Sequence, residues 1–154
     1  DGWLGDFIKN MKKEDALIIT ADHGQIDVQG YTYFCNDQEL LDCLLFPPAW
    51  DLRAISFYVK STHHEKFKKA FRKYEKDFAL FSTQEIINQG ILGDFSKNLE
   101  NQKFCGDYIA IGTDTCKLAV LKKPDNLKKL HRGTHSGLTA DEMLVPVIVA
   151  AGKQ

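Results

Sequence analysis

Two short runs of aliphatic, mostly β-branched residues, one near each end of the sequence, limit the folds open to this chain. They are residues 16–21 (ALIITA) and residues 145–150 (VPVIVA). Unbroken apolar runs of this length are typical of strands that are buried on both faces of a parallel sheet. We therefore expect both runs to be core strands of an α/β fold.

The segment between these runs has a different pattern. Strand-like and helix-like stretches alternate in the order β-α-β-α-β-β, with strands expected at 54–59, 78–81, 108–111 and 116–121, and helices at 63–74 and 83–89. A turn at residues 112–114 is expected to join the last two strands as an antiparallel pair. We predict that residues 1–50 and 123–154 form part of an α/β core, and that residues 51–122 are an inserted α+β cap.

The composition is that of a folded domain, and it argues against several classes of function. The chain has 154 residues, of which 44% are hydrophobic, so it can bury a core. Its 20 basic and 21 acidic side chains give a net charge of -1, which does not support a general electrostatic grip on nucleic acid. No apolar run approaches the roughly 20 residues that span a bilayer. The usual motifs of serine hydrolases and phosphate-binding loops are also absent from the sequence.

The sharpest candidate for chemistry is the pair Asp22 and His23, which directly follows the first apolar run. Open α/β sheets bind ligands outside the carboxyl ends of their strands, and Gly24 permits a tight turn there. A carboxylate and an imidazole that converge at a strand end suit zinc, manganese or iron. The alternative is a capped turn, in which Asp22 accepts hydrogen bonds from loop amides and His23 packs nearby.

A second candidate is His135, which lies between Gly133 and Gly137. The two glycines let the backbone approach a ligand closely, and Thr139 and Glu142 form a capping box for a helix just downstream. Because helix N-termini favour anions, His135 fits either a metal ligand or a donor to an anionic substrate. The alternative is an ordinary surface histidine.

Residues 17–25 (LIITADHGQ) resemble the metal-binding strand end of the alkaline phosphatase superfamily. Residues 133–146 (GTHSGLTADEMLVP) resemble the C-terminal motif of its type I phosphodiesterase/nucleotide pyrophosphatase branch. The resemblance covers residues 1–30 and 131–150, whereas residues 31–130 match only as a variable insertion. Ser136 stands where the family often has glycine.

This resemblance implies a partial alkaline-phosphatase-like sheet that belongs to a two-metal site. The family's two divalent ions, usually zinc with manganese as the alternative, clamp a phosphoryl group. Asp22 and His23 match two ligands of the ion that also holds the nucleophile, and His135 matches a ligand of the other ion. The family's nucleophile, a threonine or serine, and its remaining ligands lie upstream of the matched strand.

The implied function is hydrolysis of a phosphodiester or nucleotide pyrophosphate, with a phosphate-ester or nucleotide-like small molecule as substrate. Only half of the family's protein ligands are matched, and the nucleophile is not among the matched residues. We therefore expect this chain to require the N-terminal part of the same protein. By itself it should be inactive and should bind metal weakly.

Two kinds of alternative function stay open at this point. Metal-dependent phosphomutases, phosphomonoesterases and sulfatases of the same superfamily have similar motifs, and the upstream nucleophile would distinguish them. A non-catalytic interaction module, with residues 51–122 as its binding unit, is the alternative from a different class. The four dispersed cysteines favour a reducing, cytoplasmic compartment, although a signal or membrane anchor would lie upstream.

Overall fold

A computed structural model describes residues 2–91, 93, 99–113, 115, 117–120 and 132–152. Its helices are α1 (Gly2–Lys9), α2 (Gln38–Leu41), α3 (His64–Phe71), α4 (Thr83–Asn88) and α5 (Ala140–Met143), with 3-10 turns at Phe34–Asn36, Arg72–Tyr74 and Leu99–Cys105. Its strands are β1 (Ala16–Thr20), β2 (Ile26–Asp27), β3 (Gly30–Tyr33), β4 (Ala49–Trp50), β5 (Ala54–Phe57), β6 (Phe78–Ser82), β7 (Tyr108–Gly112), β8 (Lys117–Val120), β9 (Gly133–Thr134) and β10 (Val147–Ala151). The chain is thus a mixed α/β protein with small sheets.

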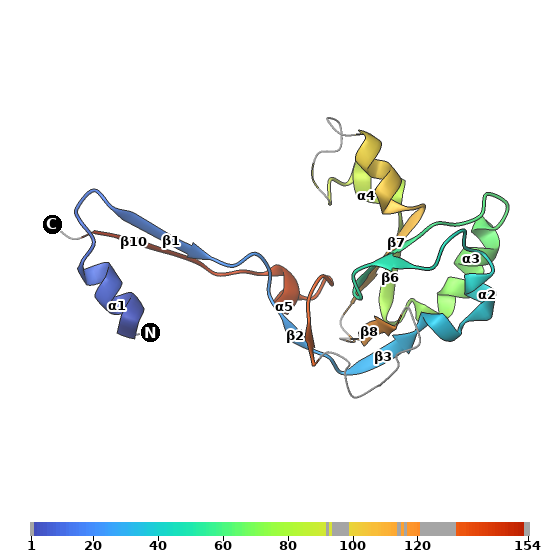
Figure 1. Ribbon diagram of the computed structural model, residues 1–154, viewed down its shortest axis with the longest axis horizontal. Coiled ribbons are helices and arrows are strands. Elements are labelled where there is room, and N and C mark those ends of the chain that lie inside the picture. The colour runs from blue at the N-terminus through green and yellow to red at the C-terminus, as the bar shows by residue number, and fades with distance from the viewer. Residues whose placement is uncertain are drawn as a thin grey trace.

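The elements form an elongated arrangement with three parts (Figure 1). At one end, β1 and β10 form a two-stranded ribbon with α1 beside it. In the middle, α5 lies near the short pair β2–β9. At the other end, the four-stranded sheet β4-β5-β7-β6 and helices α2, α3 and α4 form a larger unit, with β3 and β8 paired at its base. We call it the cap unit, although α2 and β4 precede the predicted cap at residues 51–122. None of the helices in the described part of the chain is long and apolar enough to cross a membrane.

The two apolar runs form strands as predicted, but the expected parallel setting is wrong, and within the described residues the two strands are not buried. β1 and β10 pair with each other and run antiparallel, with Ile18 opposite Val149. Both of these side chains are 67% exposed. One whole face of the ribbon is open to solvent: Ala16, Ile18, Thr20, Val147, Val149 and Ala151. An apolar run predicts a strand whose side chains can be buried. Burial also needs a layer that covers them, and the described residues supply no such layer for this face of the ribbon.

The cap unit contains the main hydrophobic core. Five phenylalanines are fully buried in it and pack ring against ring: Phe34, Phe57, Phe67, Phe71 and Phe78. The apolar spacing of the sequence predicted the inward face of α3, and its lysines lie on the opposite face. Ser82 and Glu85 cap α4 reciprocally, since Glu85 N–H donates to Ser82 Oγ at 3.2 Å and Ser82 N–H donates to Glu85 Oε2 at 2.7 Å.

The core of the cap unit includes residues on both sides of the predicted boundary at residue 51. Phe34, Leu40 and Leu44 pack in the same cluster as Phe57. The boundary at residue 51 stays a prediction, and the one near residues 122–123 lies outside the described residues.

The expected antiparallel pairing of the last two cap strands is wrong. The strand-like stretch at 108–111 forms β7, which lies in the sheet between β5 and β6 and pairs with both. Because both edges of β7 are taken, β8 has no edge there to join. It pairs instead with β3, in parallel, from Gly30 opposite Lys117 to Tyr33 opposite Val120. Residues 116 and 121, at the predicted ends of this strand, lie outside the described residues.

Candidate functional site

The predicted site residues lie in two loops that a short strand pair holds side by side. Asp22 and His23 follow β1, and His135 follows β9. β2 and β9 run antiparallel, with Ile26 opposite Thr134. This pairing places the loop before β2 next to the loop after β9, although the two loops come from opposite ends of the sequence.

The three candidate side chains are brought together. The imidazole rings of His23 and His135 stack with 3.9 Å between their centroids and 20° between their planes. Asp22 Oδ2 lies 3.7 Å from His23 Nε2, and Asp22 Oδ1 accepts a hydrogen bond from the His23 N–H at 3.1 Å. The last contact is a hydrogen bond from a loop amide, of the kind that the alternative interpretation of Asp22 expected, so this bond and the clustering coexist.

The Nδ1 atom of each ring has a local partner. His23 Nδ1 lies 2.6 Å from the Gly24 carbonyl oxygen, and a carbonyl only accepts, so the Nδ1 position carries the proton. His135 Nδ1 lies 2.7 Å from Ser136 Oγ. Ser136 has a φ of +79°, in the left-handed region that favours glycine. Metal-binding histidines are typically held in this way, through one ring nitrogen, so that Nε2 is left for the ion.

The donor types fit a transition metal, but the set is incomplete. Two imidazoles and a carboxylate are ligands that zinc and manganese accept. Within the described ranges, however, no three His, Cys, Asp or Glu side chains are arranged to hold one ion. The Asp22 side chain is 89% exposed, and the contacts described for its carboxylate are both with the neighbouring His23. The residues present therefore fit part of a metal site.

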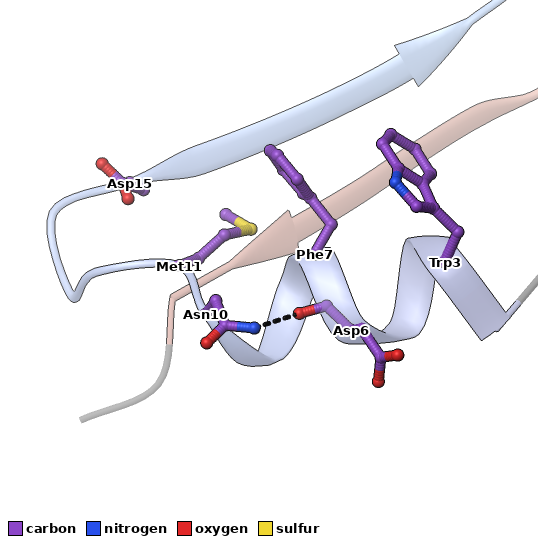
Figure 2. Close-up of a pocket in the computed structure, with 6 residues that line it drawn as sticks. All are labelled: Trp3, Asp6, Phe7, Asn10, Met11 and Asp15. Atoms are coloured by element: carbon purple, nitrogen blue, oxygen red, sulfur yellow. Dashed lines mark hydrogen bonds between the residues drawn. The ribbon is translucent and has the colours of Figure 1, made fainter.

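A separate hollow lies beside α1, at the other end of the ribbon from His23. Figure 2 shows Trp3, Phe7 and Met11 on the side of α1 that faces the strands, with Asp6, Asn10 and Asp15 at the edge. Trp3 and Phe7 stack at 5.8 Å. The hollow contains none of the predicted site residues and is not part of the candidate site.

Glu142, in α5, joins both histidine loops. Its backbone carbonyl accepts a hydrogen bond from the Gly24 N–H at 2.9 Å, directly after His23. Its carboxylate accepts from the Gly137 N–H at 2.8 Å, just after His135, and from the Thr139 hydroxyl at 2.7 Å. The capping box predicted the contact with Thr139. The bond to Gly137 spans only five residues, whereas the bond to Gly24 is tertiary and no local pattern indicates it.

Sequence reasoning missed Arg53, which binds the same carboxylate from the cap unit. Its Nε donates to Glu142 Oε1 at 2.6 Å and its Nη2 donates to Glu142 Oε2 at 2.8 Å, and both side chains are fully buried. Burial raises the pKa of Glu142, but hydrogen bonds from Arg53, Thr139 and Gly137 outweigh that effect and leave the pKa below its ordinary value. No motif distinguishes Arg53 from a surface arginine.

Comparison with known proteins supports the fold. No model of a known protein family matches the sequence, and no curated protein matches it in sequence. Among solved structures, human ectonucleotide pyrophosphatase/phosphodiesterase 5 superposes with a TM-score of 0.62 and 16% identity over 97% of this chain. The murine protein of the same name gives a TM-score of 0.60 and 16% identity over 99% of this chain. The chain resembles this phosphodiesterase in fold.

The match covers only part of the ectonucleotide pyrophosphatase/phosphodiesterase structures. This chain spans 37% of the human protein and 38% of the murine one. An inactive variant of the murine protein, solved in complex with AMP, matches with a TM-score of 0.55 and 16% identity, over 89% of this chain and 33% of that one. At this level of identity the likeness shows the fold alone.

Proposed function

We propose that this chain is the C-terminal part of a two-metal phosphohydrolase that cleaves phosphodiesters or nucleotide pyrophosphates. Asp22 and His23 would bind the ion that also holds the nucleophile, and His135 would bind the other ion. The ions would be zinc, with manganese as the alternative. The nucleophile and the remaining ligands would come from the N-terminal part of the same protein.

The observation that carries this proposal is the stacking of His23 on His135. With 3.9 Å between their ring centroids, the two imidazoles are close enough to serve one site whose two ions would lie roughly 3.5–4 Å apart. A capped turn and an unrelated surface histidine would have no reason to meet in this way.

Each part of this chain has a defined task in the proposed site. When bound, the two ions would activate the nucleophile and neutralise charge on the phosphoryl group. The Gly24 carbonyl orients the His23 ring and Ser136 orients the His135 ring. The open apolar face of the ribbon is where we expect the N-terminal part to pack, because burial of these side chains would favour association.

The solved relatives suggest the substrate class. The murine structure with AMP makes a nucleotide the first ligand to test. The sequence motif at 133–146 favours a diesterase over a phosphomutase, phosphomonoesterase or sulfatase of the superfamily.

Zinc titration of the 154-residue chain by calorimetry tests the metal assignment. We expect weak saturable binding that His23→Ala and His135→Ala each reduce by at least tenfold, the range typical of lost metal-site residues. His63→Ala is the matched control, because His63 is the N-cap residue of α3 and its ring contacts the hydroxyl of the neighbouring Thr62 at 2.9 Å. Equal affinity in wild type and both site variants would contradict the assignment and leave the interaction module as the better function.

Activity of the same chain is the second measurement. With a nucleotide phosphodiester and zinc we expect no turnover, because we expect the nucleophile to belong to the N-terminal part of the protein. Turnover by this chain alone would contradict the proposed dependence on the N-terminal part.

A further inference from the structure

The ion pair between Arg53 and Glu142 is fully buried, and both side chains make further hydrogen bonds. Besides its two bonds to the carboxylate, Arg53 donates from Nη1 to the Lys117 carbonyl at 2.8 Å and from Nη2 to the Thr113 carbonyl at 2.9 Å. The guanidinium thus makes hydrogen bonds through all three of its nitrogens in a site without solvent.

Two glycines make room for this pair. A Cβ on Gly112 would lie 2.6 Å from Arg53 Cζ, and a Cβ on Gly137 would overlap Arg53 Nη2 and lie 2.5 Å from Glu142 Oε2. Any side chain at either position would push the pair apart. The backbone of the cap unit and the backbone of the His135 loop are therefore both shaped around the guanidinium.

Stability alone is a poor explanation for such a pair. Removing two charges from water costs several kcal/mol for each ion, and apolar replacements of buried ion pairs are often neutral or stabilising. What the pair supplies is a link between the cap unit and the two histidine loops. Arg53 belongs to the cap unit, whereas Glu142 bonds to the backbone directly after His23 and two residues after His135.

We propose that Arg53 is a positioning residue that, through Glu142, holds the loops of His23 and His135 in register. The guanidinium fixes the carboxylate in one orientation. The carboxylate fixes Gly137, while the backbone of Glu142 fixes Gly24. The cap unit thereby sets the spacing of the two imidazoles. The proposal rests on the proposed function only for its consequence for metal binding, since the ring spacing is a property of the chain itself.

The test compares Arg53→Met with the double variant Arg53→Met/Glu142→Leu in the full 154-residue chain. The double variant leaves no uncompensated charge, so it is expected to fold even where the single variant does not. The matched control is Lys73→Met, which breaks another ion pair to a buried carboxylate, that of Asp37 at 2.8 Å, within the cap unit.

Two readouts report the position of the histidines in these variants. The first, made without metal, is the nuclear Overhauser effect between the ring protons of His23 and His135. The second is zinc affinity by calorimetry. We expect the folded Arg53 variants to lose the inter-ring signal and to bind zinc at least tenfold more weakly, with Lys73→Met unchanged in both.

Each outcome decides one of the two proposals. A double variant that is as stable as wild type and keeps both the inter-ring signal and the zinc affinity would overturn the positioning role. Loss of the inter-ring signal in a chain whose wild type binds no zinc would support the positioning role and contradict the metal assignment.

Discussion

His23 and His135 stack face to face at 3.9 Å, although one follows the first strand of the chain and the other follows the ninth. Neither histidine lies in a strand. Their meeting depends on the short pair β2–β9 and on Glu142, which bonds to the backbone of both loops.

Gly24→Ala should separate the His23 loop from α5. A Cβ there would overlap the Asp141 carbonyl oxygen and lie 2.8 Å from the Asp141 carbonyl carbon, which is backbone and cannot move alone. We expect a loss of about 1–3 kcal/mol in the free energy of unfolding, measured with urea. Gly30→Ala is the control, because its Cβ would only touch the flexible Lys117 side chain at 3.6 Å. Equal losses in the two variants would contradict the close packing at Gly24.

Ser136 combines an unfavourable backbone conformation with a side-chain contact to His135. Ser136→Gly and Ser136→Ala both remove the hydroxyl, but only alanine keeps the cost of the positive φ. We expect Ser136→Ala to be less stable than Ser136→Gly by about 1 kcal/mol. Zinc affinity should fall equally in both variants, as calorimetry would show. Unchanged affinity would mean that the hydroxyl does not orient the His135 ring.

The contribution of Glu142 to stability should depend on pH. Its pKa is lower in the folded protein than the ordinary value of 4.5, because hydrogen bonds from Arg53 and others outweigh the effect of burial. The contribution is therefore complete above about pH 4.5 and is lost as the pH falls through the lower folded pKa. Denaturant unfolding should show Glu142→Gln to be about 3–5 kcal/mol less stable than wild type at pH 7.

This difference between wild type and Glu142→Gln should shrink as the pH falls below 4. The variant should still lose stability in acid, because Asp37 also has a pKa below its ordinary value in the folded protein. Burial raises the pKa of Asp37, but hydrogen bonds from Lys73, Tyr74 and Leu40 outweigh that effect. A difference that does not vary between pH 3 and pH 7 would contradict the lowered pKa of Glu142.

Phe34 should be a principal support of the cap unit. It is fully buried and its ring contacts Phe57, Phe71, Tyr74 and Phe78. Phe34→Ala should cost about 3–5 kcal/mol in the free energy of unfolding. Phe104→Ala removes a ring that is 67% exposed and should cost far less. A comparable loss from both variants would place the stabilising core elsewhere.

Local sequence signals predicted the elements of this fold better than their surroundings. The run ALIITA indicates a strand because β-branched side chains fit a pleated backbone, and β1 forms there. The same run was expected to be buried, yet Ile18 lies in water. Burial depends on what covers a strand, and no local pattern carries that information.

Pairing is a second property that local patterns do not determine. Two strand-like stretches around a glycine-containing turn usually form a hairpin. Here β7 is held on both edges by β5 and β6, so β8 pairs with β3 instead. The partner of β8 therefore depends on which strand edges are still free in the fold as a whole.

The candidate site divides in the same way. The sequence indicates Asp22, His23 and His135 because metal-type residues stand beside strand ends and glycines, and their role as metal ligands stays a prediction. Arg53 was missed because its partner, Glu142, lies 89 residues away in the sequence. Within its own segment, Arg53 has only the features of a solvated arginine.

The pairing of β1 with β10 also constrains the order of folding. The register joins Ala16 to Ala151, so the ribbon closes a loop that contains nearly the whole chain. Closing a loop costs more entropy the longer it is, and contacts of large sequence separation form slowly. Once the cap unit and the Arg53–Glu142 link have formed, the free length between the two strands is much shorter. We therefore expect the ribbon to form late in folding, and while it is open both of its strands would present unpaired edges to other chains.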